Sequence, residues 1–276
     1  MLVDKSEWQG KSGETWAAEW RRTDRSFTRL TERLLQRTRE FTFRKVLDVG
    51  CGAGELSLAI ARGRRDVTVT GVDVSPKLIE AATERGSHLG NVRFILADAA
   101  EWASDHATAP DFLISRHGVM FFGDPPAAFA NLARQAQKDA GLMFSCFRDV
   151  SENPFFTEVG KLLPEAPPPI DAAAPGPFAF ADKDRVTSIL SAGGWTDIAF
   201  EAVDFPMIAG AGENAVEDAF AYFCRIGPAA RASAELEGEE KDRFLSRVHA
   251  LCERHDHDGI VALPAAAWIV TAKKAS

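Results

Sequence analysis

Short apolar runs alternate with amphipathic stretches between residue 44 and about residue 150. The amphipathic stretches repeat apolar residues at helical spacing, and two of them begin at an N-cap residue followed by proline, Ser75-Pro76 and Asp124-Pro125. The apolar runs, rich in β-branched and aromatic residues, occupy 46–49, 67–72, 92–97, 112–115 and 142–147. This alternation is typical of repeated strand–helix–strand units, so we predict an α/β fold with a doubly wound, Rossmann-like parallel sheet.

The regions flanking this repeat differ in pattern. We predict N-terminal cap helices over residues 1–43 and a core over 44–276, with further helices at about 213–256 and a last strand at 262–272. The segment 151–181 is rich in proline, and we expect a stiff, irregular lid there because long irregular loops in compact domains usually cover a binding site. Five arginines at helical spacing are interpreted as a solvated helix face: Arg22, Arg25, Arg29, Arg33 and Arg37.

Charge and cysteine usage exclude several classes of protein. Forty acidic against 32 basic residues give a net charge of −8, so nucleic acid is not an expected partner. No apolar run has membrane-spanning length and no signal peptide is visible, so we expect a cytoplasmic protein with no membrane partner. The four cysteines lack CxxC spacing, and we interpret them as free thiols with no bound metal. We interpret the 255–258 stretch, His-Asp-His-Asp, as a polar loop.

The candidate chemistry lies where predicted strands end. The first strand runs into a turn with three glycines, and Asp73, Asp98 and Ser115 follow the next three strands. In a right-handed doubly wound sheet these ends share one edge, where ligands bind. Strands about 4.8 Å apart make the crevice from Asp98 to Ser115 roughly 14 Å long, which suits an extended adenosyl amino acid.

Charge distinguishes between two ligands that could fill such a crevice, a dinucleotide and S-adenosylmethionine. The spacing is GxGxG, and Glu55 opens the helix after the turn, where we expect it to repel the pyrophosphate of a dinucleotide. S-adenosylmethionine is net positive and suits an edge with Asp48, Asp73 and Asp98. We therefore favour this cofactor. The alternatives are an NAD-dependent oxidoreductase and a catalytically silent S-adenosylmethionine-binding partner protein.

Three segments resemble the motifs of class I S-adenosylmethionine-dependent methyltransferases: VLDVGCGAG (46–54), GVDVSPKLIEAA (71–82) and VRFILADAAEW (92–102). Nearly the whole chain is similar to a bacterial branch labelled ubiquinone- or menaquinone-biosynthesis-like. That likeness rests on W-x-G-x-x-G-x-x-W (8–16), SRHGVMFF (115–122), ENPFF (152–156), PGPFAFAD (175–182) and LPAAAWIVTA (263–272). It implies a seven-stranded sheet of order 3-2-1-4-5-7-6 with the last strand antiparallel, and methyl transfer to a small molecule.

The resemblance also implies which residues hold the cofactor. Asp73 accepts hydrogen bonds from the ribose hydroxyls, Asp98 binds the adenine amino group, and Ser115 presents its carbonyl to the amino group of the methionine portion. Asp48 orients the glycine turn, which approaches the methionine portion. The full predicted set is Asp48, Gly50, Cys51, Gly52, Gly54, Asp73, Val74, Asp98, Ala99 and Ser115.

The sequence says less about the methyl acceptor and the residues that bind it. We expect an apolar or aromatic small molecule, methylated on O, N, C or S. His117 is the candidate general base or substrate contact, with packing as the alternative, and it departs from the plain aromatic usual at this position in the branch that the chain resembles. Aromatic residues outside the sheet either pack a cap or line a pocket that closes over the sulfonium, and the lid candidates are Trp8, Trp16, Phe178 and Phe180.

Overall fold

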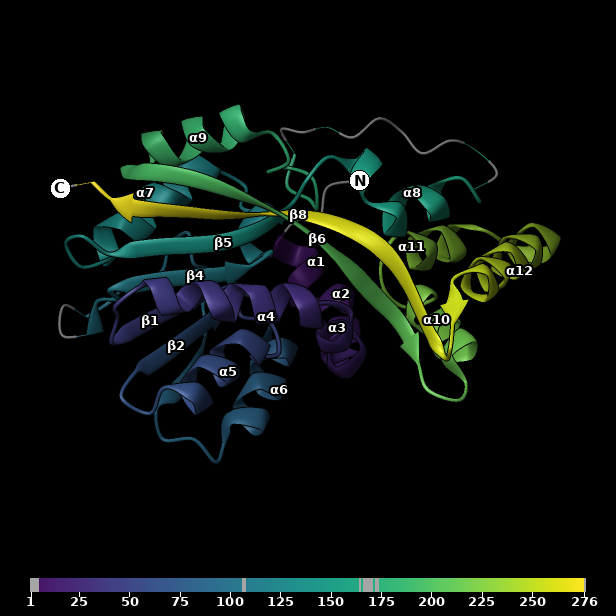
Figure 1. Cartoon of the computed structure of the whole chain (residues 1–276), viewed down its shortest axis with the longest axis horizontal. Coiled ribbons are helices and arrows are strands. Elements are labelled where there is room, and N and C mark those ends of the chain that lie inside the picture. Colours follow the sequence, from purple (N-terminus) through teal and green to yellow (C-terminus); the bar gives the residue numbers. More distant parts are fainter. Residues whose placement is uncertain (1–4, 106–107, 164, 166–170, 172–173, 276) are drawn as a thin grey trace.

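The computed structural model describes residues 5–105, 108–163, 165, 171 and 174–275. Its sheet has the strand order β3-β2-β1-β4-β5-β8-β6, with β8 antiparallel to both of its neighbours (Figure 1). The strands are β1 (Lys45–Val49), β2 (Thr68–Asp73), β3 (Val92–Leu96), β4 (Phe112–Arg116), β5 (Gly141–Phe147), β6 (Trp195–Ala211) and β8 (Ile260–Lys274). A two-residue strand, β7 (Asp256–His257), pairs with β8. The predicted doubly wound sheet and its order are confirmed, with β8 as the seventh strand.

Helices cover the parallel half of the sheet and begin at the caps that the sequence indicates. The Ser75 hydroxyl accepts the Leu78 N–H, and the Asp124 carboxylate accepts the Ala127 N–H. Both caps satisfy backbone donors that a helix N-terminus otherwise leaves unpaired. The helices over the parallel strands are α5 (Glu55–Gly63), α6 (Pro76–Gly86) and α7 (Pro125–Gln135), and α9 (Lys183–Ala192) packs against α7 and the edge strand β6.

Strands β6 and β8 form a ribbon that is longer than the rest of the sheet. Their pairing runs from Trp195 opposite Lys274 to Ala211 opposite Ile260, whereas β5 pairs with β8 only as far as Ala267. The free half of the ribbon carries a group of helices beyond the sheet (Figure 1). These are α10 (Ala215–Phe223), α11 (Pro228–Glu235) and α12 (Gly238–Arg254).

Three of the N-terminal helices, α1 to α3, lie between the strand ends and α10, and the fourth, α4, crosses in front of the sheet in this view (Figure 1). They are α1 (Lys5–Gln9), α2 (Lys11–Ala18), α3 (Trp20–Ser26) and α4 (Thr28–Arg37), followed by the 3-10 turn η1 (Thr38–Glu40). Helix α2 sits directly on the start of α6, because a Cβ on Gly13 would lie 2.2 Å from the Ser75 Oγ. This close packing fixes the N-terminal helices over the edge of the sheet where β1 and β2 end.

The arginine stripe on α3 and α4 is a solvated face only at Arg29, which is exposed and pairs with Glu32 of the same helix. Arg22 and Arg25 bind Asp218 of α10 at 2.7 and 2.5 Å, and Arg33 binds Glu201 of β6 at 2.5 Å. The stripe therefore joins the N-terminal helices to the ribbon and to α10. Spacing along one helix does not reveal this, because the acidic partners lie more than 160 residues away in the sequence.

The predicted irregular lid holds regular structure in its first part. The 3-10 turn η4 (Val150–Glu152) and helix α8 (Pro154–Gly160) follow β5, and α8 packs against β8. Asn153 fixes this turn, since its Oδ1 accepts the Ala266 N–H at 2.9 Å. The expectation of a wholly irregular segment over 151–181 is thus wrong for residues 151–160, while its prolines at 164 and 167–169 lie outside the described residues.

Candidate functional site

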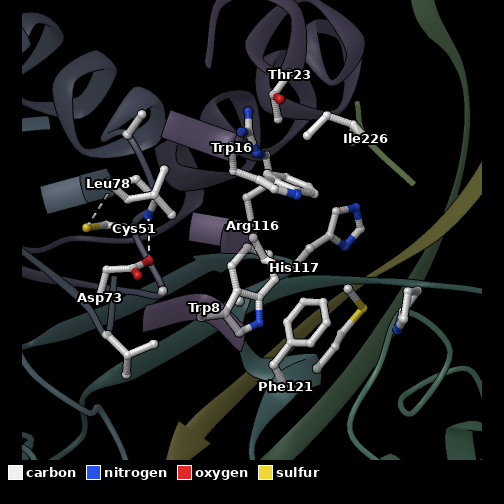
Figure 2. A pocket seen from close by; sticks show the side chains of 18 of the residues that line it. Trp8, Trp16, Thr23, Cys51, Asp73, Leu78, Arg116, His117, Phe121 and Ile226 are labelled. Carbon is white, nitrogen blue, oxygen red and sulfur yellow. Dashed lines mark hydrogen bonds between the residues drawn. The ribbon is translucent and has the colours of Figure 1, made fainter. Parts of the chain in front are cut away.

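A cavity of about 850 Å³ lies at the ends of the parallel strands, beneath the N-terminal helices. Figure 2 shows Asp73 and Cys51 on one side of it, His117 and Ile226 on the other, and Trp8, Trp16 and Arg116 between them. The sheet edge contributes residues 48–53, 72–74, 97–100, 116–118 and 120–123. The size is within the range of small-molecule sites, roughly 300–1,000 Å³.

The glycine turn after β1 needs glycine for two separate reasons. Gly50, Gly52 and Gly54 have φ angles of 65°, 54° and 85°, a region that glycine adopts without steric cost. A Cβ on Gly50 would also lie 2.8 Å from the Cα of Gly118, so the turn packs backbone to backbone against the segment after β4. Gly50 and Gly52 line the cavity, whereas Gly54 packs against the ring of Phe94 and does not.

Asp48, near the end of β1, stabilises the glycine turn through a hydrogen bond to α5. Its carboxylate is buried and accepts a hydrogen bond from the Ser57 hydroxyl at 2.6 Å, which ties β1 to α5. Burial raises the pKa of Asp48 to about 6. The neighbouring Cys51 thiol also lines the cavity, and burial raises its pKa well above the ordinary value, so it stays a thiol at neutral pH.

Asp73 joins the turn to α6 and faces the cavity. Its two oxygens accept the N–H groups of Gly52 and Ser75, each at 2.9 Å. Burial raises the pKa of Asp73, and the backbone hydrogen bonds oppose that shift. A carboxylate accepts about four hydrogen bonds, so this one retains capacity for a ligand hydroxyl. Val74, next in sequence, lines the cavity as well.

Asp98 already has a partner from the N-terminal helices. Its Oδ2 lies 2.8 Å from the Nζ of Lys5 on α1, and its Oδ1 accepts the Ala100 N–H at 2.9 Å. Both Asp98 and Ala99 line the cavity. Helix α1 therefore lies across the end of the cavity where the sequence indicates the adenine.

Ser115 does not line the cavity. Its buried hydroxyl donates to the Val49 carbonyl at 2.7 Å and accepts the Gly118 N–H at 3.1 Å, so it holds the ends of β1 and β4 together. The next two residues, Arg116 and His117, do line the cavity. Ser115 was predicted at this crevice through its backbone carbonyl. It is not among the residues that line the cavity, and its side chain has a structural role instead.

Arg116 is surrounded by carboxylates. It is paired with Glu55 and lies 3.6 Å from Asp24, and it donates to the Thr31 hydroxyl at 2.8 Å. Burial raises the pKa of Glu55, and the charge of Arg116 opposes that shift. Because Glu55 is bound to Arg116 and does not line the cavity, the predicted repulsion of a pyrophosphate by Glu55 is wrong.

His117 is held in an unusual position. Its φ of 66° lies in the left-handed region, and its ring stacks on Phe147 with centroids 4.3 Å apart and meets the edge of Phe27 at 5.2 Å. The residue is 8% exposed, and neither ring nitrogen has a hydrogen-bond partner among the described residues. Burial, together with the charge of Arg116, lowers the pKa of His117 to about 3, so its ring is neutral at physiological pH.

The aromatic candidates divide into two groups. Trp8 and Trp16 line the cavity and contact each other edge to face, with centroids 5.4 Å apart. Phe180 is fully buried and packs on Phe144, and Phe178 packs against Phe147. Because these two rings fill the core behind the cavity, the structure does not bring them into the pocket, which corrects their predicted lid role.

Several cavity residues were missed by the sequence reasoning. Tyr222 of α10, the single tyrosine of the chain, is buried and lines the cavity. Met207 of β6 also lines it, and no local motif marks either position. Phe155 and Phe156 of α8 line the cavity as well, and they belong to the ENPFF segment on which the resemblance rests. These four residues reach the site because the long ribbon and α8 fold back over the ends of β4 and β5.

No group of three or more His, Cys, Asp or Glu side chains among the described residues has an arrangement that could hold a metal ion. No helix within the described ranges has the length and apolar character that crossing a bilayer requires.

Curated relatives match part of the chain. Trans-aconitate 2-methyltransferase of Delftia acidovorans is 33% identical over 111 residues, which are 38% of this chain and 40% of the relative. Ubiquinone biosynthesis O-methyltransferase of Pseudoalteromonas translucida is 28% identical over 128 residues, 44% of this chain and 53% of the relative. The match thus spans about half the length of these relatives.

The fold is shared with solved methyltransferases. Phosphoethanolamine N-methyltransferase 2 of Haemonchus contortus, solved in complex with S-adenosyl-L-methionine, superimposes with a TM-score of 0.57 at 15% identity, covering 100% of this chain and 61% of that one. The profile described as "Methyltransferase domain" matches residues 44–194, more than half of the chain. These residues include the glycine turn, both strand-end aspartates and His117. The chain therefore belongs to this methyltransferase domain family.

Proposed function

We propose that this protein transfers a methyl group from S-adenosylmethionine to a small, apolar or aromatic acceptor. The observation that carries the proposal is Asp73, a strand-end carboxylate that holds the glycine turn and faces the cavity. Family membership supports the same activity. It does not favour the alternative of an NAD-dependent oxidoreductase.

The residues present fit the cofactor. Asp73 offers acceptor capacity for ribose hydroxyls, and the backbone of Gly50 and Gly52 offers a surface without side chains for the methionine portion. Asp98 and Ala99 line the end proposed for the adenine. The carboxylates of Asp48 and Asp73 in the cavity wall complement a net-positive ligand, and Asp98 joins them when Lys5 is displaced from it. Gly54 and Ser115 support this arrangement from outside the cavity.

The chain's own contribution to the reaction is alignment and exclusion of water. When bound, the cofactor supplies a methyl group activated by a sulfonium. Trp8 and Trp16 cover the cavity from the N-terminal helices, while His117 lies on the opposite side from Asp73 (Figure 2). Holding an acceptor in line with the methyl group in a dry cavity supplies much of the rate in such a displacement.

Methyl transfer from labelled S-adenosylmethionine into a metabolite extract tests the proposal. We expect label in a small molecule with the wild-type protein and at least tenfold less with Asp73→Ala. Absence of label from a protein that binds S-adenosylhomocysteine would instead support the catalytically silent alternative. A protein that binds neither S-adenosylmethionine nor its product would refute the cofactor assignment.

A further inference from the structure

The cations around the cavity are largely neutralised. Five lysine and arginine side chains line it among the residues that the structure describes, and four of them are paired with carboxylates. Lys5 pairs with Asp98, Arg116 with Glu55 and Asp24, Arg225 with Glu19 at 2.5 Å, and Arg231 with Glu7 at 3.7 Å. The fifth, Lys11, is exposed. Apart from Lys11, the cations that a carboxylate on the methyl acceptor would meet are therefore already bound to carboxylates of the protein.

The part of the cavity around His117 is built from rings in mutual contact, which we call the aromatic wall. Phe147 contacts Phe156 edge to face at 5.3 Å, Phe156 contacts Phe155 at 5.3 Å, and Phe155 contacts Tyr222 at 6.3 Å. The wall comprises Phe27, His117, Phe147, Phe155, Phe156 and Tyr222. Such a surface favours flat apolar molecules and penalises burial of an unpaired charge.

His117 supplies a polar feature in this wall. Its ring is more than nine-tenths buried, lines the cavity and leaves both nitrogens without a partner in the described part of the chain. Burying an unbonded polar group costs free energy, so a native site normally satisfies it with a ligand or water. A neutral imidazole offers one N–H donor and one acceptor nitrogen.

We infer that the acceptor is an uncharged, flat apolar molecule whose hydroxyl or N–H group donates a hydrogen bond to the ring of His117. This inference rests on the proposed function and specifies its substrate class. His117 then determines specificity, because a methyl acceptor that carries a hydrogen-bond donor binds more tightly than one without it. The paired cations discriminate against anionic methyl acceptors.

Binding to the protein saturated with S-adenosylhomocysteine tests the inference with three matched probes. 2-Naphthol carries the donor group, 2-methylnaphthalene replaces its hydroxyl with a methyl group of similar size, and 6-hydroxy-2-naphthoate adds a carboxylate. Affinities are measured by fluorescence titration of the wild type and of His117→Phe, which keeps an aromatic ring. His117→Gly is the second variant, because glycine suits the positive φ if phenylalanine does not fold.

We expect 2-naphthol to bind at least tenfold more tightly than the naphthoate. We also expect the variant to weaken 2-naphthol about fivefold to tenfold more than 2-methylnaphthalene, the scale of one hydrogen bond. A purely structural role of His117 moves both neutral probes equally and would overturn its assignment. Tighter or equal binding of the naphthoate, or no binding of any probe, would overturn the acceptor class. S-adenosylhomocysteine binding, titrated first, reports separately on the proposed function.

Discussion

Replacing Asp73 with alanine is the sharpest perturbation of the proposed cofactor site. The carboxylate lies at the end of β2, accepts two backbone N–H groups at 2.9 Å and faces the cavity. Its remaining acceptor capacity is the part that we assign to the ribose. The substitution therefore removes at least one hydrogen bond from ligand to carboxylate, and it also releases the N–H groups of Gly52 and Ser75.

The size of the effect follows from that single hydrogen bond. A hydrogen bond to a charged acceptor contributes about 1.5–3 kcal/mol, which corresponds to an affinity loss of about tenfold to 150-fold. Isothermal titration calorimetry with S-adenosylhomocysteine measures the dissociation constant directly. We expect Asp73→Ala to raise it by at least ten times relative to the wild type.

The control variant is Asp204→Ala, which removes an exposed carboxylate that binds Arg148 and does not line the cavity. We expect its dissociation constant to equal that of the wild type. Circular dichroism and the unfolding midpoint establish that both variants are folded. If folded Asp73→Ala binds S-adenosylhomocysteine within about threefold of the wild type, the assignment of Asp73 to the ribose is refuted.

Three further variants test charges around the cavity. Lys5→Met frees Asp98, and we expect S-adenosylhomocysteine to bind up to about fivefold more tightly by calorimetry, the scale of a partly exposed ion pair. Arg116→Met leaves the largely buried Glu55 without its partner, and we expect about 3 kcal/mol less stability in urea unfolding, partly restored by adding Glu55→Gln. Burial raises the pKa of Asp48 to about 6, so its ionisation lowers stability as pH rises from about 4 to 6. Asp48→Asn removes this loss, and we expect its unfolding free energy relative to wild type to rise by about 3 kcal/mol across that interval.

Each of these three predictions can be contradicted by a specific result. Weaker cofactor binding by the Lys5 variant would mean that the lysine assists the ligand instead of competing with it. Equal stability of the single Arg116 variant and the double variant would remove the ion pair as the cause. A stability difference for the Asp48 variant that does not change with pH would show that this carboxylate titrates at its ordinary pKa.

The parallel half of the fold was predictable because its signals are local. The run at 46–49 becomes β1 (Lys45–Val49), and the caps at Ser75 and Asp124 start α6 and α7 as expected. β-branched runs, glycine turns and capping side chains act within a few residues. Asp73 and Asp98 follow parallel strands joined by right-handed crossovers, and such strands end at the same edge of a sheet. Their meeting in one cavity was therefore predictable.

The acceptor half was not predictable because its parts are distant in sequence. Tyr222 reaches the cavity on a helix carried by the β6–β8 ribbon, and its position depends on contacts such as that between Arg22 and Asp218, 196 residues apart. The spacing of residues within one helix holds no information on such partners. The same limit explains Phe180, whose proline-rich surroundings indicated a loop while its ring packs against Phe144 in the core.

The central claim is that the cavity at the strand ends binds S-adenosylmethionine. The most direct measurement is a crystal structure of the protein grown with S-adenosylhomocysteine. We predict the ribose on the Asp73 carboxylate, the adenine beside Ala99 with Lys5 displaced from Asp98, and the sulfur facing the side of the cavity that holds His117. A product molecule bound elsewhere, or a nicotinamide dinucleotide occupying this cavity in its place, would contradict the account.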